Sequence, residues 1–329
     1  LGLLTVSKLP VPVVSVGNVT TGGTGKTPLV EWVCSAIASL GLHAGEREGK
    51  EICVLTRGYG RSNPKTQVVV SNGAELLAGE REAGDEPFLL AENLVGIAAV
   101  ISNSNRAAAG RWAIEKWTTE VFVLDDGFQH LPLSRDLDIV IVDATNPWGG
   151  GGLLPYGRLR ESPRCLSRAD CVVITRAEQV PDLTTIKEAV QQFVGEAPIF
   201  SSRMLTSGIR RVDCASGDRQ GALTQPVGAF CGVGNPESFF EHLRREGLQL
   251  AFTRTFADHH RYKQSEFDTL VKDAVAQGAR SLITTAKDAI KLKSFNFGIP
   301  CYVLEIEILI DEEERLVEII RGAISNAAS

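Results

Sequence analysis

The sequence predicts an α/β protein with a mostly parallel β-sheet that is covered by helices on both faces. Short, continuously apolar segments alternate along the chain with segments of helical apolar spacing, a pattern typical of buried parallel strands. A glycine-rich turn separates the first apolar segment from the first helical one. The alternation restarts after about residue 200, and 329 residues is about twice a typical domain. We therefore expect a larger domain at 1–200 and a smaller α/β domain at 201–329.

The elements follow in order along the first half of the chain. A strand is expected at Val11–Val16, then the glycine-rich turn, then a helix at Pro28–Leu40 that ends before Gly41. Further continuous apolar segments predict strands at Ile52–Thr56, Ile97–Ile101, Val121–Leu124, Leu137–Val142 and Cys171–Thr175. Helical spacing predicts helices at Glu82–Leu94 and Ala107–Lys116.

The second half repeats the same alternation. The segment from Phe200 to Thr224 is expected to hold the crossing between the two domains. The elements expected beyond it are strands at Val227–Cys231, Ser281–Thr284 and Cys301–Leu304, a helix from Pro236 through Leu243, and a helix at Ser265–Gln277.

The amino-acid composition excludes several classes of protein and of binding partner. Apolar residues make up 43% and charged residues 22% of the chain, which is typical of a folded globular protein. The formal net charge of −6 argues against broad nucleic-acid binding, which usually needs a basic face. Seven cysteines without a C-x-x-C pair indicate reduced thiols and not a zinc site. No apolar run reaches the ~18–20 residues that span a bilayer.

The glycine-rich turn, GNVTTGGTGKTP, is a candidate phosphate loop. Glycines let backbone N–H groups surround phosphate oxygens, and a helix N-terminus adds a favourable dipole. Lys26 is expected to reach the β- and γ-phosphates and the Thr27 hydroxyl to bind Mg²⁺. The strict motif fails at one position, because Thr20 stands where its first glycine belongs. The residues expected to bind the nucleotide are Thr20, Thr21, Gly22, Gly23, Thr24, Gly25, Lys26 and Thr27. The sequence therefore predicts a nucleoside triphosphate site.

Acids that follow two of the predicted strands are the candidate metal ligands. In phosphate-loop proteins an aspartate at the end of a neighbouring strand holds Mg²⁺. Asp125 and Asp126 follow Val121–Leu124, and Asp143 follows the next strand as a rival. An acidic turn at a strand end is the alternative to a metal site.

A phosphate loop alone does not separate a kinase from a binding switch. A GTPase, an ATPase switch or a metallochaperone-type protein is the alternative class. A GTPase carries an N-K-x-D motif after a strand, and the sequence offers only Thr175-Arg176 and TAKD at 285–288 in comparable places. The GTPase interpretation is therefore the weaker one.

Eight segments between Val11 and Ala289 stand out together: SVGNVTTGGTGKTP, LTRGYGR, AGDEPFLLA, LDDGFQHLPLSRDLDIVIVDA, GGGLLPYGRLRE, FCGVGNP, FADHHRY and TTAKDA. In this order they resemble one family, the tetraacyldisaccharide 4′-kinases of the lipid A pathway. The resemblance implies transfer of the γ-phosphoryl group of ATP to the 4′-hydroxyl of a tetraacylated glucosamine disaccharide 1-phosphate. It also implies a phosphate-loop domain joined by a β-ribbon to a smaller α/β domain.

The resemblance also implies roles for individual residues. Asp85 and His259 would form the dyad that activates the sugar hydroxyl, beside the phosphate role of Lys26. From the residues alone, Asp85 would be a helix N-cap and Asp258-His259-His260 a polar loop. The weaker candidates for contacts to the disaccharide or its phosphate are Arg57, Glu86, Gln129 and His130. A neutral imidazole held by a carboxylate is suited to remove a proton from a hydroxyl.

Partners and location follow from the same resemblance. We expect a monomer that takes a lipid substrate, binds no nucleic acid and touches a membrane peripherally through an N-terminal segment. Of that segment only Leu1–Pro10 stands before the first strand. The expected location is the cytoplasmic face of the inner membrane in a bacterium, or a mitochondrion or other organelle in a plant. The polar loops Gly45–Lys50 and Gly60–Thr66 are longer than the compact bacterial pattern and are expected to alter the mouth of the site.

Overall fold

The computed structural model describes residues 6–41, 50–213 and 223–327 and divides the chain into two compact units. Unit 1 comprises Leu1–Arg203 and Ile308–Ser329, and unit 2 comprises Met204–Glu307. The first boundary lies close to the expected one at residue 200. The expected second domain, 201–329, differs from unit 2 at its C-terminal end, because residues 308–329 belong to unit 1. The expected loop Gly45–Lys50 and the expected thiol of Cys214 lie largely or wholly outside the described residues.

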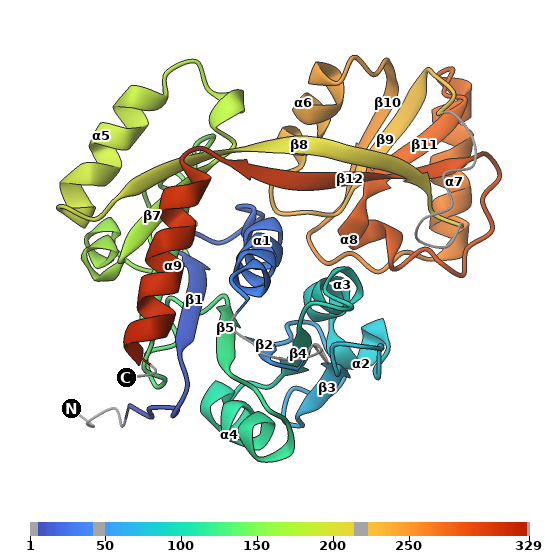
Figure 1. The fold of residues 1–329 in the computed structure, drawn as a ribbon. Coiled ribbons are helices and arrows are strands. Elements are labelled where there is room, and N and C mark those ends of the chain that lie inside the picture. The colour runs from blue at the N-terminus through green and yellow to red at the C-terminus, as the bar shows by residue number, and fades with distance from the viewer. Residues whose placement is uncertain (1–5, 42–49, 214–222, 328–329) are drawn as a thin grey trace. The chain divides into compact units, whose positions relative to one another are not determined.

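Strands and helices alternate along both units, as the sequence predicts (Figure 1). Those of the first part of unit 1 are β1 (Val13–Asn18), α1 (Lys26–Ser39), β2 (Ile52–Thr56), β3 (Val68–Ser71), α2 (Glu80–Ala83), α3 (Asp85–Asn93), β4 (Ala99–Ser102), α4 (Arg106–Lys116), β5 (Val121–Asp125), β6 (Leu137–Asp143), β7 (Cys171–Thr175) and α5 (Leu183–Val194). The later elements are β8 (Ile199–Arg211), β9 (Val227–Cys231), α6 (Pro236–Arg245), β10 (Leu250–Thr255), α7 (Gln264–Ala276), β11 (Ser281–Thr285), α8 (Ala286–Ala289), β12 (Cys301–Ile310) and α9 (Glu313–Ala327). Among the described residues, no helix is both long and apolar enough to cross a membrane.

The sheet of unit 1 is parallel except at one edge. Its strands follow the order β8-β7-β6-β1-β5-β2-β4-β3, and only β3 runs antiparallel to its neighbour. The strand that leads into the phosphate loop, β1, is therefore flanked by β5 and β6, both of which end in an acid. Parallel strands bring their carboxyl ends to one edge of a sheet, which is where ligands bind in open α/β folds.

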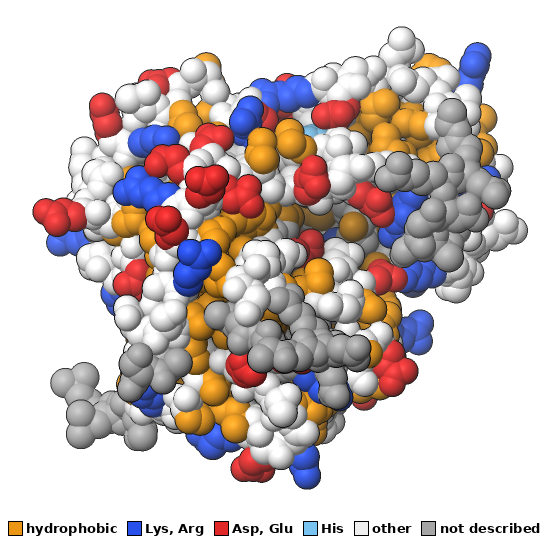
Figure 2. Space-filling model, in the orientation of Figure 1, with side chains coloured by type: hydrophobic (Ala, Val, Ile, Leu, Met, Phe, Trp, Pro, Cys, Tyr) orange, Lys and Arg blue, Asp and Glu red, His pale blue; other side chains and the backbone are white. Residues whose placement is uncertain are grey.

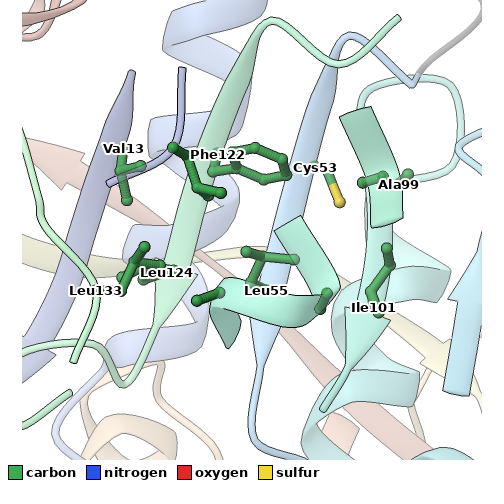
Figure 3. Close-up of a cluster of buried hydrophobic side chains, with 12 residues drawn as sticks. Val13, Cys53, Leu55, Ala99, Ile101, Phe122, Leu124 and Leu133 are labelled. Carbon is green, nitrogen blue, oxygen red and sulfur yellow. The ribbon is translucent and has the colours of Figure 1, made fainter. Parts of the chain in front are cut away.

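Two helical layers cover this sheet. Alternate residues of β5, β2 and β4 face α4, and Figure 3 shows Phe122, Cys53 and Ala99 within the buried cluster on that face. The opposite face carries α1 and α3, which pack against the same strands and against each other. Every residue of β1 and β2 is buried, as in strands covered on both faces, and most of these residues are apolar.

The C-terminal helix α9 completes unit 1 by packing against α1. Its buried residues Leu316, Ile320 and Ile324 recur at helical spacing and form the packed face. Acidic side chains gather over its first turn, which holds Glu313 and Glu314 (Figure 2). Negative charge there is stabilised by the helix dipole.

Unit 2 is a smaller α/β sandwich. Its sheet has the order β10-β9-β11-β12-β8, with parallel pairing from β10 to β12. The α6 residues Phe240 and Leu243 pack on one face of this sheet. The α7 residues Phe267 and Leu270 pack on the other, next to Phe230. Both long strands, β8 and β12, begin in one unit and end in the other.

Several elements differ from the sequence prediction. The single helix expected at Glu82–Leu94 is two helices, α2 and α3, because Gly84 between them has φ +94°. A Cβ at Gly84 would also lie 2.5 Å from the Tyr59 carbonyl oxygen. The expected crossing segment from Phe200 contains the strand β8. The strands and helices that the sequence prediction left out are β3, α5, β10, α8 and α9.

Core packing in unit 1 gives a stability prediction. Phe122 is fully buried among the side chains labelled in Figure 3. Phe122→Ala should lower the free energy of unfolding of unit 1 by about 3–5 kcal/mol, because it removes apolar contacts and leaves a cavity. Urea denaturation followed by far-UV circular dichroism measures this change. Val95, which is 45% exposed, is the control, and its replacement by alanine should cost about 0.5 kcal/mol or less. Equal losses in the two variants would contradict the assignment of the core.

Candidate active site

The phosphate loop joins β1 to α1 at the edge of the sheet where the strands end in acids. Gly25 forms the N-cap of α1 in a left-handed conformation with φ 88°, which a residue with a Cβ rarely adopts. No side chain of the described residues caps this helix, and its first turn holds no acid. The first N–H groups of α1 are thus suited to bind an anion.

Asn18, the last residue of β1, organises the loop from inside. Its side-chain nitrogen donates to the carbonyl oxygen of Thr20 at 2.7 Å and to the hydroxyl of Thr24 at 2.9 Å. Its side-chain oxygen lies 3.4 Å from Nζ of Lys26. Asn18 is fully buried, so one amide side chain fixes both the curl of the loop and the direction of its lysine.

The ends of β6 and β7 hold the other side of the loop. The Thr175 hydroxyl donates to the Thr24 carbonyl oxygen at 2.8 Å, and Arg176 donates to the Gly23 carbonyl oxygen at 2.6 Å. Arg176 also forms an ion pair with Asp143. Asp143, the rival metal ligand, therefore serves to hold an arginine that supports the phosphate loop.

Asp126 is the anionic partner of the loop lysine. One of its carboxylate oxygens lies 3.6 Å from Nζ of Lys26, and both accept from Arg160 at 2.7 Å. Burial alone would raise the pKa of Asp126, but the positive charges of Lys26, Arg160 and Arg106 outweigh burial and hold it below its usual value. Its backbone φ of 54° is uncommon for a residue other than glycine. Asp126 is a permanent anion at neutral pH.

The neighbouring acid, Asp125, has a different environment. It is buried, and the Thr56 hydroxyl donates to one of its oxygens at 2.8 Å. Burial, followed by the negative charges of Glu86 and Asp126, raises the pKa of Asp125 to about 6. A carboxylate in such surroundings is stabilised by a cation.

The donors near Asp125 fit Mg²⁺. The described residues contain no group of three or more His, Cys, Asp or Glu side chains that could hold a metal. Mg²⁺ needs no such cage, since one or two carboxylates and the substrate phosphates are its usual ligands. The Asp125 carboxylate and the Thr27 hydroxyl are oxygen donors, as this ion requires.

Gln129 connects this site to the segment after β6. Its amide nitrogen donates to the Asn18 carbonyl oxygen and to Glu161, both at 2.8 Å. Its amide oxygen accepts from Arg160 at 3.1 Å. These contacts show Gln129 as a link between β1 and the Arg160 segment, and its contact with substrate stays a prediction.

His130 lies in a cluster of arginines. Its Nδ1 is 3.2 Å from Arg106, a buried residue that also donates to the Asp125 carbonyl oxygen. Burial and the positive charges of Arg106, Arg135 and Arg57 lower the pKa of His130 to about 4. The ring is therefore neutral at physiological pH. Arg57 itself is exposed and donates to the Tyr59 hydroxyl at 2.8 Å.

Asp85 and Glu86 begin α3 in unit 1. The N-cap of this helix is Gly84, so the local interpretation of Asp85 as the N-cap is wrong. Asp85 is only 8% exposed. Glu86 is close enough to Asp125 to raise the pKa of that acid. This places the start of α3 beside the acids of β5.

His259 lies in unit 2, in the segment between β10 and α7. Its φ of 60° is left-handed, and its side chain is 35% exposed. Nζ of Lys287 lies 3.3 Å from Nε2 of His259 and 3.0 Å from the Asp258 carboxylate. Because a lysine ammonium can only donate, Nε2 supplies the lone pair of that hydrogen bond. The pairing of His259 with Asp85, a residue of unit 1, stays a prediction.

His260 has a different environment from its neighbour. Its Nε2 lies 2.7 Å from Glu266, and its ring stacks on Phe256 at 4.8 Å between centroids. The edge of the same ring meets Tyr262. These contacts give His260 a structural role in unit 2.

The sequence interpretation missed four residues of the site. Asn18, Arg106, Arg160 and Arg176 make the contacts described above but match no general motif. Asn18 and Arg160 stood within segments that carried the family resemblance, which was the signal available for them.

Comparison with known proteins gives one consistent family. The family model for tetraacyldisaccharide-1-P 4'-kinase matches residues 1–325. A tetraacyldisaccharide 4'-kinase from Geobacter metallireducens is 41% identical over 88% of this chain and 81% of its own length. One from Desulfotalea psychrophila is 37% identical over 92% of this chain and 84% of its own. A crystal structure of LpxK from Aquifex aeolicus in complex with ATP superposes with a TM-score of 0.73 at 31% identity, and covers 98% of this chain and 91% of that one.

The lowered pKa of His130 predicts a pH effect on stability. The unfolded chain binds this proton near pH 6.5 and the folded chain near 4. Between these values the unfolded state binds more protons, so the free energy of unfolding rises with pH. The stabilisation is complete above about pH 6.5 and is lost as the pH falls to about 4. For this half-exposed ring we expect about 1–2 kcal/mol after allowing for solvent screening.

The variant that isolates the effect is His130→Asn, since an asparagine oxygen can accept from Arg106 in place of Nδ1. Urea unfolding at pH 7 and pH 4.5 should show a larger loss for the unmodified protein than for His130→Asn. Parallel losses in the two proteins would mean that His130 titrates normally.

Proposed function

The chain belongs to the tetraacyldisaccharide-1-P 4'-kinase family, and from that premise we propose how its residues perform the reaction. The reaction transfers the γ-phosphoryl group of ATP to the 4′-hydroxyl of a tetraacylated glucosamine disaccharide 1-phosphate, in the lipid A pathway. The observation that carries this function is the phosphate loop, with Lys26 held between Asn18 and Asp126. The alternative left open by the motif alone, a GTPase or metallochaperone-type switch, is not the family that the chain matches.

Lys26 and the start of α1 are proposed to bind the phosphates of ATP. The backbone N–H groups from Gly22 to Thr27 would donate to phosphate oxygens, and Lys26 would neutralise the charge that develops on the transferring group. The Thr21 N–H already donates to the Arg158 carbonyl oxygen. Asp126 and Asn18 hold the lysine in place before the substrates bind. Preorganised charge of this kind costs no rearrangement during the reaction.

Thr27 and Asp125 are proposed as the protein ligands of Mg²⁺, with Asp126 next to them. Bound there, Mg²⁺ would neutralise negative charge on the phosphates and orient them. Asp125 is the better donor of the pair, because Arg160 and Lys26 already balance the charge of Asp126. Burial, followed by the nearby negative charges of Glu86 and Asp126, raises the pKa of Asp125 to about 6, and a bound cation would offset both effects.

His259 is proposed as the base that removes the proton of the acceptor hydroxyl, with Asp85 as its positioning carboxylate. A neutral imidazole is suited to accept the proton of a hydroxyl, and Nε2 of His259 lies 3.3 Å from Nζ of Lys287. A carboxylate that accepts from one ring nitrogen would leave the lone pair of the other nitrogen for that proton. Arg57, Glu86, Gln129 and His130 are proposed to assist in binding the disaccharide or its phosphate.

We also propose that the protein acts as a monomer in peripheral contact with a membrane. The acceptor of the family reaction is a lipid with four acyl chains, which favours contact with a membrane surface. In a bacterium the face of the inner membrane that ATP reaches is the cytoplasmic one, and in a plant the corresponding place is an organelle membrane.

The proposed function is tested by phosphate transfer from radiolabelled ATP. The purified protein should phosphorylate a tetraacyl disaccharide 1-phosphate dispersed in detergent and should leave a water-soluble glucosamine disaccharide unmodified. Lys26→Ala, measured at saturating ATP, should lose most of the turnover because it removes several kcal/mol of transition-state stabilisation. ATP hydrolysis without transfer to the lipid, or full turnover in Lys26→Ala, would contradict the proposal.

The metal site predicts a specific ion dependence. EDTA should abolish phosphate transfer, and Mg²⁺ but not Zn²⁺ should restore it, because the ligands are all oxygen atoms. Asp125→Asn should raise the Mg²⁺ concentration for half-maximal activity by about tenfold or more. The matched control is Asp143→Asn, which loosens the contact of Arg176 with the loop and should alter the KM for ATP instead. An unchanged Mg²⁺ dependence in Asp125→Asn would place the metal elsewhere.

The dyad predicts a pattern of coupled losses. His259→Ala should lower kcat by about 10²–10⁴-fold, the usual worth of a general base. Asp85→Asn should lower kcat similarly, and the double variant should be little worse than either single one. The built-in control is His260→Ala, which should cost less turnover because His260 is held by Glu266 and Phe256. If the two losses multiply in the double variant, Asp85 and His259 act independently. A larger loss of kcat in His260→Ala than in His259→Ala would identify His260 as the base.

A further inference from the structure

The segment between β6 and β7 carries an exposed apolar tip at Leu153, Leu154, Pro155 and Tyr156. Leu153 and Leu154 are 51% and 52% exposed, and Tyr156 is 97% exposed. Single apolar residues on a surface are common, but adjacent large ones mark an interaction surface.

This exposure is built into the backbone of the loop. The Leu153 carbonyl oxygen accepts from the N–H groups of Tyr156 and Gly157, at 2.9 and 3.0 Å. Leu159 and Gly152 close the neck with a further bond at 3.0 Å. A Cβ at Gly157 would lie 2.2 Å from the Gly152 oxygen, so the close approach of these two residues at the base of the tip requires glycine at position 157. The tip therefore presents its side chains outward in an ordered turn.

The base of the same loop is bonded to the phosphate loop. The Arg158 carbonyl oxygen accepts from the Thr21 N–H at 2.7 Å, and the Arg160 N–H donates to the Val19 carbonyl oxygen at 2.8 Å. The Arg160 side chain then continues to Asp126. Whatever the tip contacts is thus held at a fixed distance from the phosphoryl-transfer site.

Basic residues accompany the tip in the sequence. Residues 149–160 read GGGGLLPYGRLR and contain two arginines and no acid, and the second of these, Arg160, is paired with Asp126. Arg158 and Arg164 are both exposed. A leucine pair and a tyrosine beside basic side chains match the composition of segments that lie at the interface of an anionic bilayer.

We propose that Leu153, Leu154 and Tyr156 insert into the interface of an anionic lipid bilayer and hold the phosphate loop at the level of the lipid headgroups. This inference rests on the proposed function, in which the acceptor hydroxyl belongs to a lipid with four acyl chains. A phosphoryl site that meets such an acceptor must lie close to the bilayer surface. The tip provides the apolar contact, and Arg158 and Arg164 provide attraction to anionic headgroups.

The test compares vesicle binding with turnover. The full chain and the triple variant L153S/L154S/Y156S are sedimented with vesicles of phosphatidylcholine and phosphatidylglycerol. The triple variant should bind about tenfold less, because three apolar side chains no longer enter the interface. Its KM for tetraacyl disaccharide 1-phosphate embedded in the vesicles should rise, while its KM for ATP stays as in the unmodified protein. Arg164→Gln should weaken binding to anionic vesicles by about fivefold and leave binding to pure phosphatidylcholine unchanged.

The matched control is L77S/V95S, which replaces two residues of similar exposure, 52% and 45%, elsewhere in unit 1. It should bind vesicles as the unmodified protein does. Equal vesicle binding by the triple variant and the control would overturn the inference. So would a raised KM for ATP with unchanged vesicle binding, which would make the loop a nucleotide contact. Lack of phosphate transfer in detergent would instead overturn the proposed function, and vesicle binding is measured without it.

Discussion

The Asp126 carboxylate, shared between Lys26 and Arg160, is the interaction on which the site depends. It connects three segments that are distant in sequence: the phosphate loop, the end of β5 and the loop that follows β6. An anion between two cations is stable at partial burial, because each charge has a partner. Removal of the carboxylate would leave two unbalanced positive charges beside the phosphate loop.

The adjacent acids Asp125 and Asp126 show how environment separates identical side chains. Asp126 turns into the left-handed region, with φ 54°, and faces cations. Asp125 stays in the strand, where the Thr56 hydroxyl donates to it, and burial with the negative charges of Glu86 and Asp126 raises its pKa to about 6. One residue therefore anchors the cationic side chains while the other supplies negative charge for a metal cation. Backbone strain at Asp126 is the physical means by which the two carboxylates diverge.

The sequence predicted the parts of this protein whose causes are local. The apolar strands, GGTGKT between strand and helix, and the acids after β5 are each set by neighbouring residues, and the structure has them in place. The helix α9 was left out of the prediction although its apolar residues recur at helical spacing, so a local signal for it was present. Arg160 and Arg176 escaped because an arginine has no local signature, and only the fold brings it to Asp126 or Asp143. Asp85 resembled a cap because the sequence does not show that Gly84 takes that place.

The shape of the phosphate loop depends on the hydrogen bonds that its backbone carbonyl groups accept. Four carbonyl groups in and before the loop each accept from a side chain, and the pairs are Asn18 with Gln129, Thr20 with Asn18, Gly23 with Arg176 and Thr24 with Thr175. In a planar trans peptide the C=O and the following N–H point in opposite directions. Fixing the carbonyl groups of Gly23 and Thr24 outward therefore turns the N–H groups of Thr24 and Gly25 toward the inside of the loop. The N–H that follows Thr20, that of Thr21, instead donates to the Arg158 carbonyl oxygen. The side chains that hold the loop from β1, β7 and the segment after β5 thus determine where its donors point, and a concavity of aligned N–H groups is an anion site. The phosphate-binding property of the loop is in this sense a property of the strands around it.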